Sequence, residues 1–229
     1  MLHMSDYLYF LILIMGVISM LASARVNSVF NKYSQTRSMS GMTGEDTARR
    51  MLQAAGITDV VVCQVAGKLT DHYDPINKKL CLSEAVYGVS SVAAVGVAAH
   101  ECGHAIQHQE QYFPLTLRSL ILPVANIGSK VWIWLIIAGT IFSYNQFLIN
   151  VGIFVFSFAV LFQVITLPVE FDASRRAIKL TESYGILSSV EAGDCKKVLR
   201  AAAMTYVASA AIAILQLLRL MSLYGRRRR

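Results

Sequence analysis

Long apolar stretches separated by shorter polar segments dominate the chain. Residues 7–24, 120–142, 147–167 and 201–218 are runs of apolar residues with few or no charged side chains. The hydrocarbon core of a bilayer is about 30 Å thick and needs about 20 mostly apolar helical residues to cross it. The first three runs are therefore predicted to be transmembrane helices, and the second and third are joined by an uncharged turn at 143–146.

The first run has two interpretations. Residues 22–24, at its end, resemble the A-x-A cleavage site of a secretory signal peptide. A signal peptide carries its basic residues before the apolar run, whereas here Asp6 precedes the run and Arg25 and Lys32 follow it. This order of charges favours an uncleaved membrane anchor over a signal peptide.

The second and fourth runs are less regular than the others. Lys130 interrupts the second run and is followed by Trp132 and Trp134, so a snorkelling lysine and interfacial tryptophans are expected there. The fourth run is rich in alanine and has basic residues on both sides. It either crosses the membrane or packs against the protein or the inner membrane surface, so the pattern predicts three or four transmembrane helices.

The distribution of lysine and arginine predicts which side of the membrane each segment faces. The polar segments 25–118 and 169–200 carry many basic residues, whereas the turn at 143–146 carries none. Because basic loops remain in the cytoplasm, both polar segments are expected there, with the N-terminus outside. A crossing fourth helix would place the tetrad Arg226–Arg229 outside, against this rule. Such a basic tetrad is suited to contact with anionic lipid headgroups.

The composition agrees with a membrane protein. Apolar residues make up 55% of the 229 residues and charged residues only 15%, against roughly 25% charged in soluble domains. The length fits a single unit over 1–229. The net charge of +7 includes the terminal arginines. The sequence lacks the stripe of basic residues that would indicate nucleic-acid binding. The four cysteines form no CxxC pair and are expected to be reduced, although Cys63 and Cys81 could face each other across a hairpin.

Small elements are predicted within the first polar segment, before a longer helix. Residues 44–55 have an amphipathic helical pattern that ends at Gly56. Two short strands with turn-forming residues between them predict a β-hairpin over 60–82. A helix is expected over 83–109, with Ser83 as its N-cap.

The predicted helix carries the sequence HECGH at 100–104, an H-E-x-x-H pattern. Residues four apart share one helical face, so His100 and His104 can bind one zinc ion. Glu101 then lies beside the water that zinc activates and can take its proton. Gly103 leaves space between the two ligands. The pattern predicts one Zn²⁺ per chain, with Glu101 as the catalytic residue.

A catalytic zinc site needs a third protein ligand as well as an open position. His108 is roughly 12 Å along the helix from His100, at 1.5 Å per residue, so it is expected to be a supporting polar group rather than a ligand. Glu170 follows the third apolar run directly. If the second and third runs form a membrane hairpin, Glu170 returns to the same membrane face as the histidines. Glu170 is preferred over Asp172 as the third ligand.

These residues resemble those of the YugP-type membrane zinc metallopeptidases, the bacterial neutral zinc metallopeptidase family. The resemblance covers nearly the full chain and includes the motifs at 70–75, 82–87, 98–108, 168–174 and 199–208. The chain is similar, more distantly, to the HtpX-like and CAAX prenyl endopeptidases. These gluzincins also have membrane helices between H-E-x-x-H and a glutamate ligand on a later helix.

The resemblance implies a mainly α-helical integral membrane protein with a gluzincin-like zinc helix. It implies a zinc endopeptidase that hydrolyses peptide bonds in peptide or protein substrates, in the processing or quality control of membrane proteins. The edge strand of the hairpin at 60–82 would align an extended substrate. With the orientation given above, the protein is expected to be a multi-pass protein of the bacterial inner membrane whose active site faces the cytoplasm.

The resemblance also indicates supporting residues. In those gluzincins an aspartate four residues after the glutamate ligand orients a zinc histidine. Here Ser174 occupies that position, and Asp172 lies two residues earlier, pointing away from the ligand face. Ser174 is therefore expected to bond a zinc histidine. His72, Tyr73 and Tyr206 are candidates to polarise the scissile carbonyl oxygen.

Two alternative functions are also considered from the sequence. An intramembrane site-2-type protease has H-E-x-x-H within a spanning helix and an aspartate in a later one, but 120–142 and 147–167 contain no acidic residue. A non-catalytic membrane scaffold would hold a structural zinc ion, which usually has four protein ligands, most often cysteine. Cys102 lies within the motif but off the ligand face, which disfavours this alternative.

Overall fold

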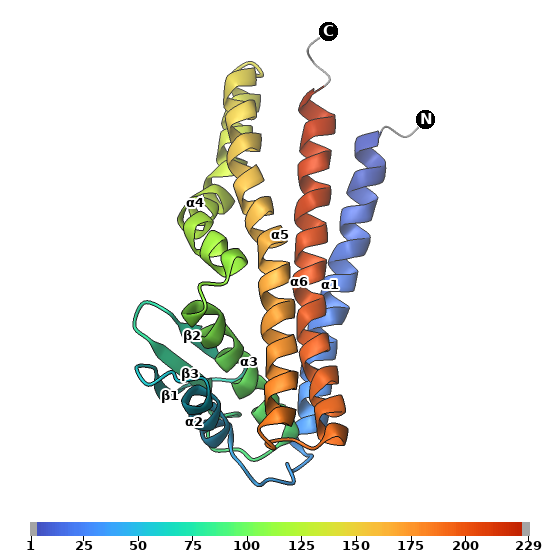
Figure 1. Ribbon diagram of the computed structural model, residues 1–229. Helices are drawn as coiled ribbons and strands as arrows, with labels where there is room; N and C mark the ends of the chain where they lie inside the picture. Colours follow the sequence, from blue (N-terminus) through green and yellow to red (C-terminus); the bar gives the residue numbers. More distant parts are fainter. Residues whose placement is uncertain (1–3, 226–229) are drawn as a thin grey trace. The chain divides into compact units, whose positions relative to one another are not determined.

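The computed structural model describes residues 4–225 and is mainly α-helical, as predicted (Figure 1). The helices in this part of the chain are α1 (Met4–Ser34), α2 (Gly44–Ala54), α3 (Val92–Gln109), α4 (Phe113–Ile141), α5 (Gln146–Ser183) and α6 (Ser189–Tyr224). The strands are β1 (Val61–Val65), β2 (His72–Asp74) and β3 (Lys79–Ser83). The tetrad Arg226–Arg229, for which lipid contact was expected, lies outside the described residues.

Four of these helices, α1, α4, α5 and α6, are long and apolar enough to cross a membrane. They contain the four apolar runs of the sequence, almost to the last residue. The most apolar window of α6 has the same mean hydropathy as that of α4, 1.8. By length and composition, the ambiguous fourth run is thus as well suited to span a bilayer as the second.

The chain forms two compact units. The first contains residues 1–22, 116–167 and 205–229, and the second contains residues 23–115 and 168–204. Helices α1, α4, α5 and α6 contribute residues to both units. The H-E-x-x-H motif and Glu170 belong to the second unit.

In the first unit, glycines allow α4 and α5 to approach each other closely. A Cβ atom at Gly128 would lie 2.6 Å from the carbonyl oxygen of Val155, and one at Gly152 would lie 3.1 Å from that of Trp132. The rings of Trp132 and Phe156 pack with their centroids 4.6 Å apart. Small residues at such contacts are typical of helix packing in membranes. These contacts make α4 and α5 the helical hairpin that the sequence predicted.

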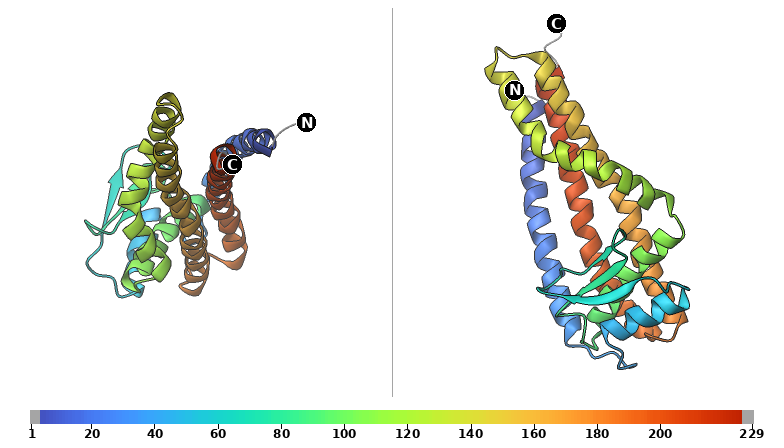
Figure 2. Two further views of the ribbon diagram at one scale, coloured as in Figure 1. Left: turned by 90° about the horizontal axis from the view of Figure 1, so that it is seen from above. Right: turned by 90° about the vertical axis from the view of Figure 1, so that its left-hand side faces the viewer.

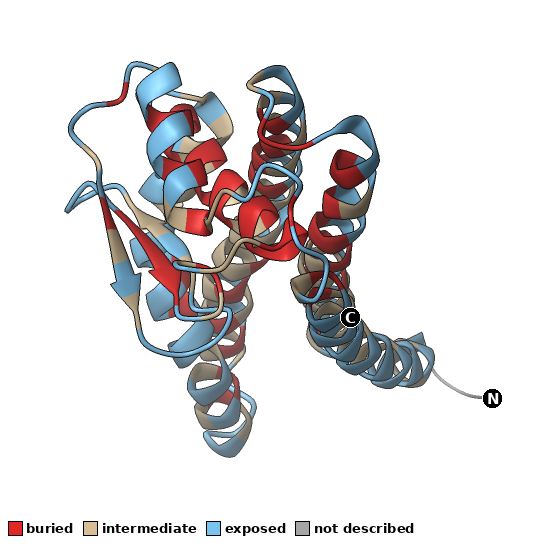
Figure 3. Ribbon diagram, turned by 90° about the horizontal axis from the view of Figure 1, so that it is seen from below, coloured by how far each residue is buried: buried red, intermediate tan, exposed pale blue. Residues whose placement is uncertain are grey.

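In the second unit, α3 forms the centre of the core. Its first turns, from Val92 to Ala99, are almost entirely buried, and in Figure 3 buried positions of this kind appear in red. Helix α2 packs against α3 and also contacts β1 and β3, beside the small sheet (Figure 2). A Cβ atom at Gly96 would lie 2.7 Å from Sγ of Cys195, so the beginning of α6 also lies close to α3.

Helix α3 begins at Val92, later than the start at Ser83 that the sequence indicated. Ser83 instead ends β3, where its backbone N–H donates to Oδ1 of Asp71 (2.7 Å) and its hydroxyl to Oδ2 (3.0 Å). Carbonyl oxygens of the residues that follow accept backbone hydrogen bonds from the first turn of α2 and from the loop before it, rather than forming a helical ladder. The N-cap of α3 is Ser91, whose hydroxyl accepts from the backbone N–H of Ala94 (3.2 Å).

The sheet also differs from the predicted single hairpin over 60–82. β2 and β3 are antiparallel neighbours, whereas β1 pairs with β3 in parallel, which gives the order β1-β3-β2. Gly67 and Leu69, both at positive φ, help the connection after β1 to turn so that β2 reaches the other edge of β3. Cys63 and Cys81 therefore face each other on parallel strands, as free thiols with their sulfur atoms 3.0 Å apart.

Candidate metal centre

Two helices of the second unit bring three metal-binding side chains together. The rings of His100 and His104 on α3 have centroids 4.7 Å apart. On α5, Oε2 of Glu170 lies 3.3 Å from Nε2 of His100 and 3.8 Å from Nε2 of His104. The three ligand atoms all lie within 4.8 Å of one another. Ligands about 2.0–2.2 Å from a tetrahedral ion lie roughly 3.4 Å apart, so this cluster fits one zinc ion.

The close approach of α3 and α5 depends on Gly103. A Cβ atom at this position would lie 2.7 Å from the carbonyl oxygen of Ala173 and 3.1 Å from its Cα. Because both atoms belong to the backbone of α5, a larger residue would push that helix away, and Glu170 with it. Space at Gly103 was expected between the two histidines, and the backbone of α5 fills it.

The electrostatic surroundings of His104 favour a bound cation. Burial lowers the pKa of His104, but the nearby carboxylates of Glu170 and Glu101 outweigh burial, so the pKa lies above its usual value. The negative charges that stabilise an imidazolium would equally stabilise a metal ion. Glu101 itself is only 8% exposed.

Cys102, within the motif, points away from this cluster. Its Sγ lies 3.7 Å from the carbonyl oxygen of Ala48 on α2, and the residue is fully buried. Burial raises the pKa of the Cys102 thiol, so it stays protonated. Cys102 thus serves as a small packing residue rather than a metal ligand.

Comparisons with known proteins identify the family. Residues 8–225 match the family described as "Putative neutral zinc metallopeptidase". The chain belongs to this family. It is also 47% identical over 207 residues to the "Putative membrane protease YugP" of Bacillus subtilis (strain 168), which covers 90% of this chain and 92% of that protein. No solved structure matches the chain.

The metal centre agrees with membership of the neutral zinc metallopeptidase family. Zinc is the metal of this family, and His100, His104 and Glu170 are positioned to bind a metal ion. Two imidazole nitrogens and one carboxylate oxygen are a donor set used by catalytic zinc sites, which keep a further position open. With its four candidate spans, the chain is a membrane protein of a zinc peptidase family.

Further side chains contact the outer nitrogens of the two histidines. Oγ of Ser174 lies 3.2 Å from Nδ1 of His100, the contact that the sequence predicted. Nδ1 of His104 lies 3.0 Å from Oε1 of Gln107. Asp172 contacts neither histidine but accepts a hydrogen bond from Nε2 of Gln107 (3.0 Å). Gln107 was not predicted, although its position three residues after His104 placed it on the same helical face.

The other candidates are not part of the cluster of three metal-binding side chains. His108 is not in the metal cluster, and its Nδ1 lies 2.9 Å from the hydroxyl of Tyr73 on β2. Burial raises the pKa of Tyr73, so its hydroxyl remains protonated. His72 is exposed, and its Nδ1 lies 2.9 Å from the carbonyl oxygen of Thr70. Tyr206 belongs to the part of α6 in the first unit, whereas the ligands belong to the second.

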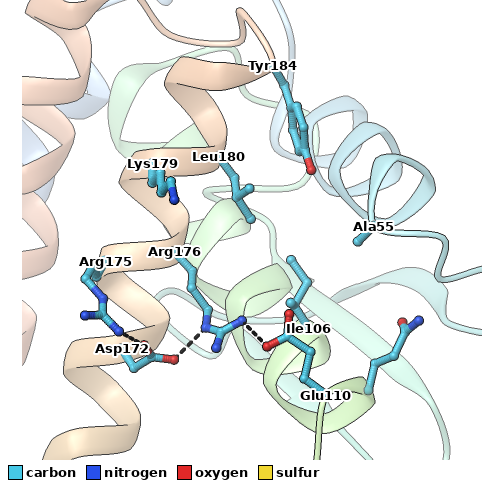
Figure 4. A pocket seen from close by; sticks show the side chains of 10 residues that line it. Ala55, Ile106, Glu110, Asp172, Arg175, Arg176, Lys179, Leu180 and Tyr184 are labelled. Carbon is cyan, nitrogen blue, oxygen red and sulfur yellow. Dashed lines mark hydrogen bonds and ion pairs between the residues drawn. The ribbon is translucent and has the colours of Figure 1, made fainter. Parts of the chain in front are cut away.

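Asp172 also lines a cavity of about 750 Å³, together with other residues of α3 and α5 and with Ala55 and Tyr184 (Figure 4). Arg176 spans part of it, donating from Nε to Oδ2 of Asp172 (2.5 Å) and from Nη1 to Oε2 of Glu110 (2.6 Å). Arg175 also pairs with Asp172. The buried carboxylate of Asp172 therefore accepts hydrogen bonds from two guanidinium groups and from Gln107.

Proposed function

We propose that this chain is a zinc endopeptidase of the gluzincin type that hydrolyses peptide bonds in peptide or protein substrates. The observation that carries the proposal is the convergence of His100, His104 and buried Glu170, with Glu101 next to the first ligand. Zinc bound there would polarise the scissile carbonyl and lower the pKa of a water molecule. Glu101 acts as the general base that removes a proton from this water and then donates it to the leaving amine.

The substrate would bind as an added strand. The sheet order places β2 at an edge, and β2 also contacts α3. An edge strand offers unpaired backbone N–H and C=O groups that can bind an extended peptide by β-addition. Tyr73 on β2, together with His72 and Tyr206, is a candidate donor to the carbonyl oxygen of that peptide.

Two observations favour this function over the alternatives. Among the described residues, α3 is not one of the four helices long and apolar enough to span a membrane, which disfavours an intramembrane site-2-type protease. A scaffold with a structural zinc ion would most often use cysteine ligands. Cys102, the cysteine of the motif, is directed at Ala48 instead.

A substitution of the base tests the catalytic role. In detergent-purified protein, Glu101→Gln should keep its zinc and lower peptide hydrolysis at least ~100-fold, the usual size of a general-base contribution. Glu84→Gln makes the same change at an exposed residue outside the cluster and should be as active as the wild type. Hydrolysis by Glu101→Gln at the wild-type rate would sink the protease assignment.

We also propose that the protein lies in the bacterial inner membrane with its active site towards the cytoplasm, where it processes or degrades membrane proteins. The concentration of lysine and arginine in 25–118 and 169–200 supports this orientation. In intact cells, a membrane-impermeant thiol reagent should label Ser143→Cys, beyond the labelling of the wild type. Met39→Cys, at a residue that is 83% exposed, should be labelled only after permeabilisation. The reverse pattern would invert the orientation.

A further inference from the structure

We infer that Gln107 is a positioning residue that fixes the proton of His104 on Nδ1 and so presents Nε2 to the metal. The inference rests on the proposed zinc centre, but its test does not depend on hydrolysis. Gln107 is completely buried, in a core where a polar side chain must find partners within the protein. Its amide can donate two hydrogen bonds and accept others, and its partners His104, Val169 and Asp172 lie on α3 and α5.

The partners of the Gln107 amide determine which way it faces. Nε2 donates to the carbonyl oxygen of Val169 (2.9 Å) and to Oδ2 of Asp172 (3.0 Å). A carbonyl and a carboxylate can only accept, so both must face the NH₂ group rather than the oxygen. The orientation of the amide therefore follows from its partners, and Oε1 must face His104.

The orientation of the amide in turn determines the tautomer of His104. Oε1 of Gln107 lies 3.0 Å from Nδ1 of His104 and can only accept a hydrogen bond. Nδ1 must then carry the proton, which leaves the lone pair of Nε2 free to bind a metal. Nε2 is the nitrogen that faces Glu170, at 3.8 Å from Oε2.

Asp172 holds the Gln107 amide in this one orientation. Arg175 and Arg176 both pair with its carboxylate, and Arg176 is tied further to Glu110 (Figure 4). A carboxylate held by two guanidinium groups remains an acceptor, so it cannot reverse the Gln107 amide. The chain Arg176–Asp172–Gln107–His104 thus fixes the direction of each hydrogen bond that leads to the imidazole of His104.

The other histidine has no such fixed partner. Nδ1 of His100 contacts Oγ of Ser174 at 3.2 Å, and a hydroxyl can either donate or accept. Ser174 therefore supports His100 without selecting its tautomer. The directional role therefore belongs to Gln107, and Ser174→Ala should weaken zinc binding less than Gln107→Leu.

Zinc affinity of the full chain in detergent tests the inference by chelator competition. Gln107→Leu should weaken Zn²⁺ binding about 10–100-fold, as loss of an outer hydrogen bond to a metal histidine typically does. It should also change the visible spectrum of the Co²⁺-substituted protein, which reports on ligand geometry. Gln109→Leu, the same change at an exposed position of α3, should leave both readouts unchanged. Wild-type zinc affinity and an unchanged Co²⁺ spectrum in Gln107→Leu would overturn the inference.

A charge-exchange pair tests the direction of the hydrogen bonds even if Gln107→Leu folds poorly. Gln107→Glu places a second carboxylate against Asp172 and should weaken zinc binding. Adding Asp172→Asn restores a donor to the new carboxylate, which still accepts from His104, so the double variant should recover at least ~10-fold in zinc affinity. A double variant that binds zinc no better than Gln107→Glu alone would overturn the assigned direction. Absence of peptide hydrolysis in the zinc-loaded wild type would count against the proposed function instead, and the zinc affinities of the variants would still test the inference.

Discussion

Helices α1 and α3 both consist largely of apolar residues, but the surroundings of those residues differ. In α1, none of the most apolar 18-residue window is buried within the protein, and Leu13 is 49% exposed. In α3, Val95 and its apolar neighbours are completely buried among other protein elements. The apolar residues of α1 are mostly large, whereas those of α3 are mostly alanine and valine. Small side chains permit close packing of protein helices, whereas large exposed ones suit contact with lipid.

The two helices also differ in their polar residues. α3 buries Glu101 and Gln107 and presents both histidines to the metal cluster. A buried polar group is tolerated only with partners, and Gln107 and the two histidines find theirs partly on α5. The comparison predicts that α3 is sensitive to small changes and that the lipid-facing positions of α1 are not.

The same substitution in both helices should give the largest contrast. Val95→Asn removes a buried apolar side chain and leaves an unpaired amide in the core, which together should cost roughly 3 kcal/mol or more of unfolding free energy. Leu13→Asn in a detergent micelle should change it by less than about 0.5 kcal/mol. For both variants, thermal unfolding measures the change in stability, and the amount of retained zinc shows whether the metal centre is intact. Equal losses in the two variants would remove the distinction between the helices.

A glycine pair tests the close approach of α3 and α5. Gly103→Ala should cost about 1–3 kcal/mol of stability through overpacking against Ala173, and it should weaken zinc binding because α5 carries Glu170. Gly193→Ala on α6, where a Cβ atom meets nothing within 4 Å, should be neutral or stabilising by up to about 1 kcal/mol. Unchanged zinc affinity in Gly103→Ala would contradict the packing argument.

The N-cap of α3 should have a smaller effect. Ser91→Ala removes the acceptor for the backbone N–H of Ala94 and should cost ~1 kcal/mol, measured by thermal unfolding. Ser91→Thr keeps a capping hydroxyl and should retain most of the stability. If Ala and Thr at this position destabilise equally, the cap does not determine where the helix begins.

The smallest expected effect concerns the reactivity of a buried thiol, Cys81, rather than stability. Burial and the neighbouring Cys63 raise the pKa of Cys81 to about 11, so its thiol is protonated at pH 8 and should alkylate slowly. Reactivity should increase as the pH approaches 11, because the raised pKa means that the thiolate forms only at high pH. Mass spectrometry after iodoacetamide treatment measures this, with Met39→Cys as an exposed control. Rapid labelling of Cys81 at pH 8 would contradict its burial.

The parts of the molecule that local sequence patterns determine were predicted well. The four apolar runs lie in four long apolar helices, and the amphipathic pattern at 44–55 matches α2, which ends before Gly56 at positive φ. The i, i+4 spacing of His100 and His104 follows from helical geometry alone. Glu170 was chosen because a helical hairpin returns the chain to the same face, and the three side chains do converge.

The errors arose where distant residues compete with local preference. Ser83 has the residue type of an N-cap, but Asp71 and β3 use its hydrogen-bonding groups, and the helix begins at Ser91 instead. The parallel pairing of β1 with β3 depends on a connection whose course no local pattern specifies. Gln107 has an ordinary helical sequence context, and its role becomes visible only through Val169 and Asp172, which lie on another helix.

The central claim is that His100, His104 and Glu170 hold one zinc ion, and metal analysis tests it most directly. The wild-type chain, purified in detergent and dialysed against a weak chelator, should contain one zinc ion per chain. Glu170→Ala should lose most of that zinc, because only two protein ligands remain. Glu182→Ala, at an exposed glutamate of the same helix, should retain it. Full zinc occupancy in Glu170→Ala would contradict the account of the metal centre.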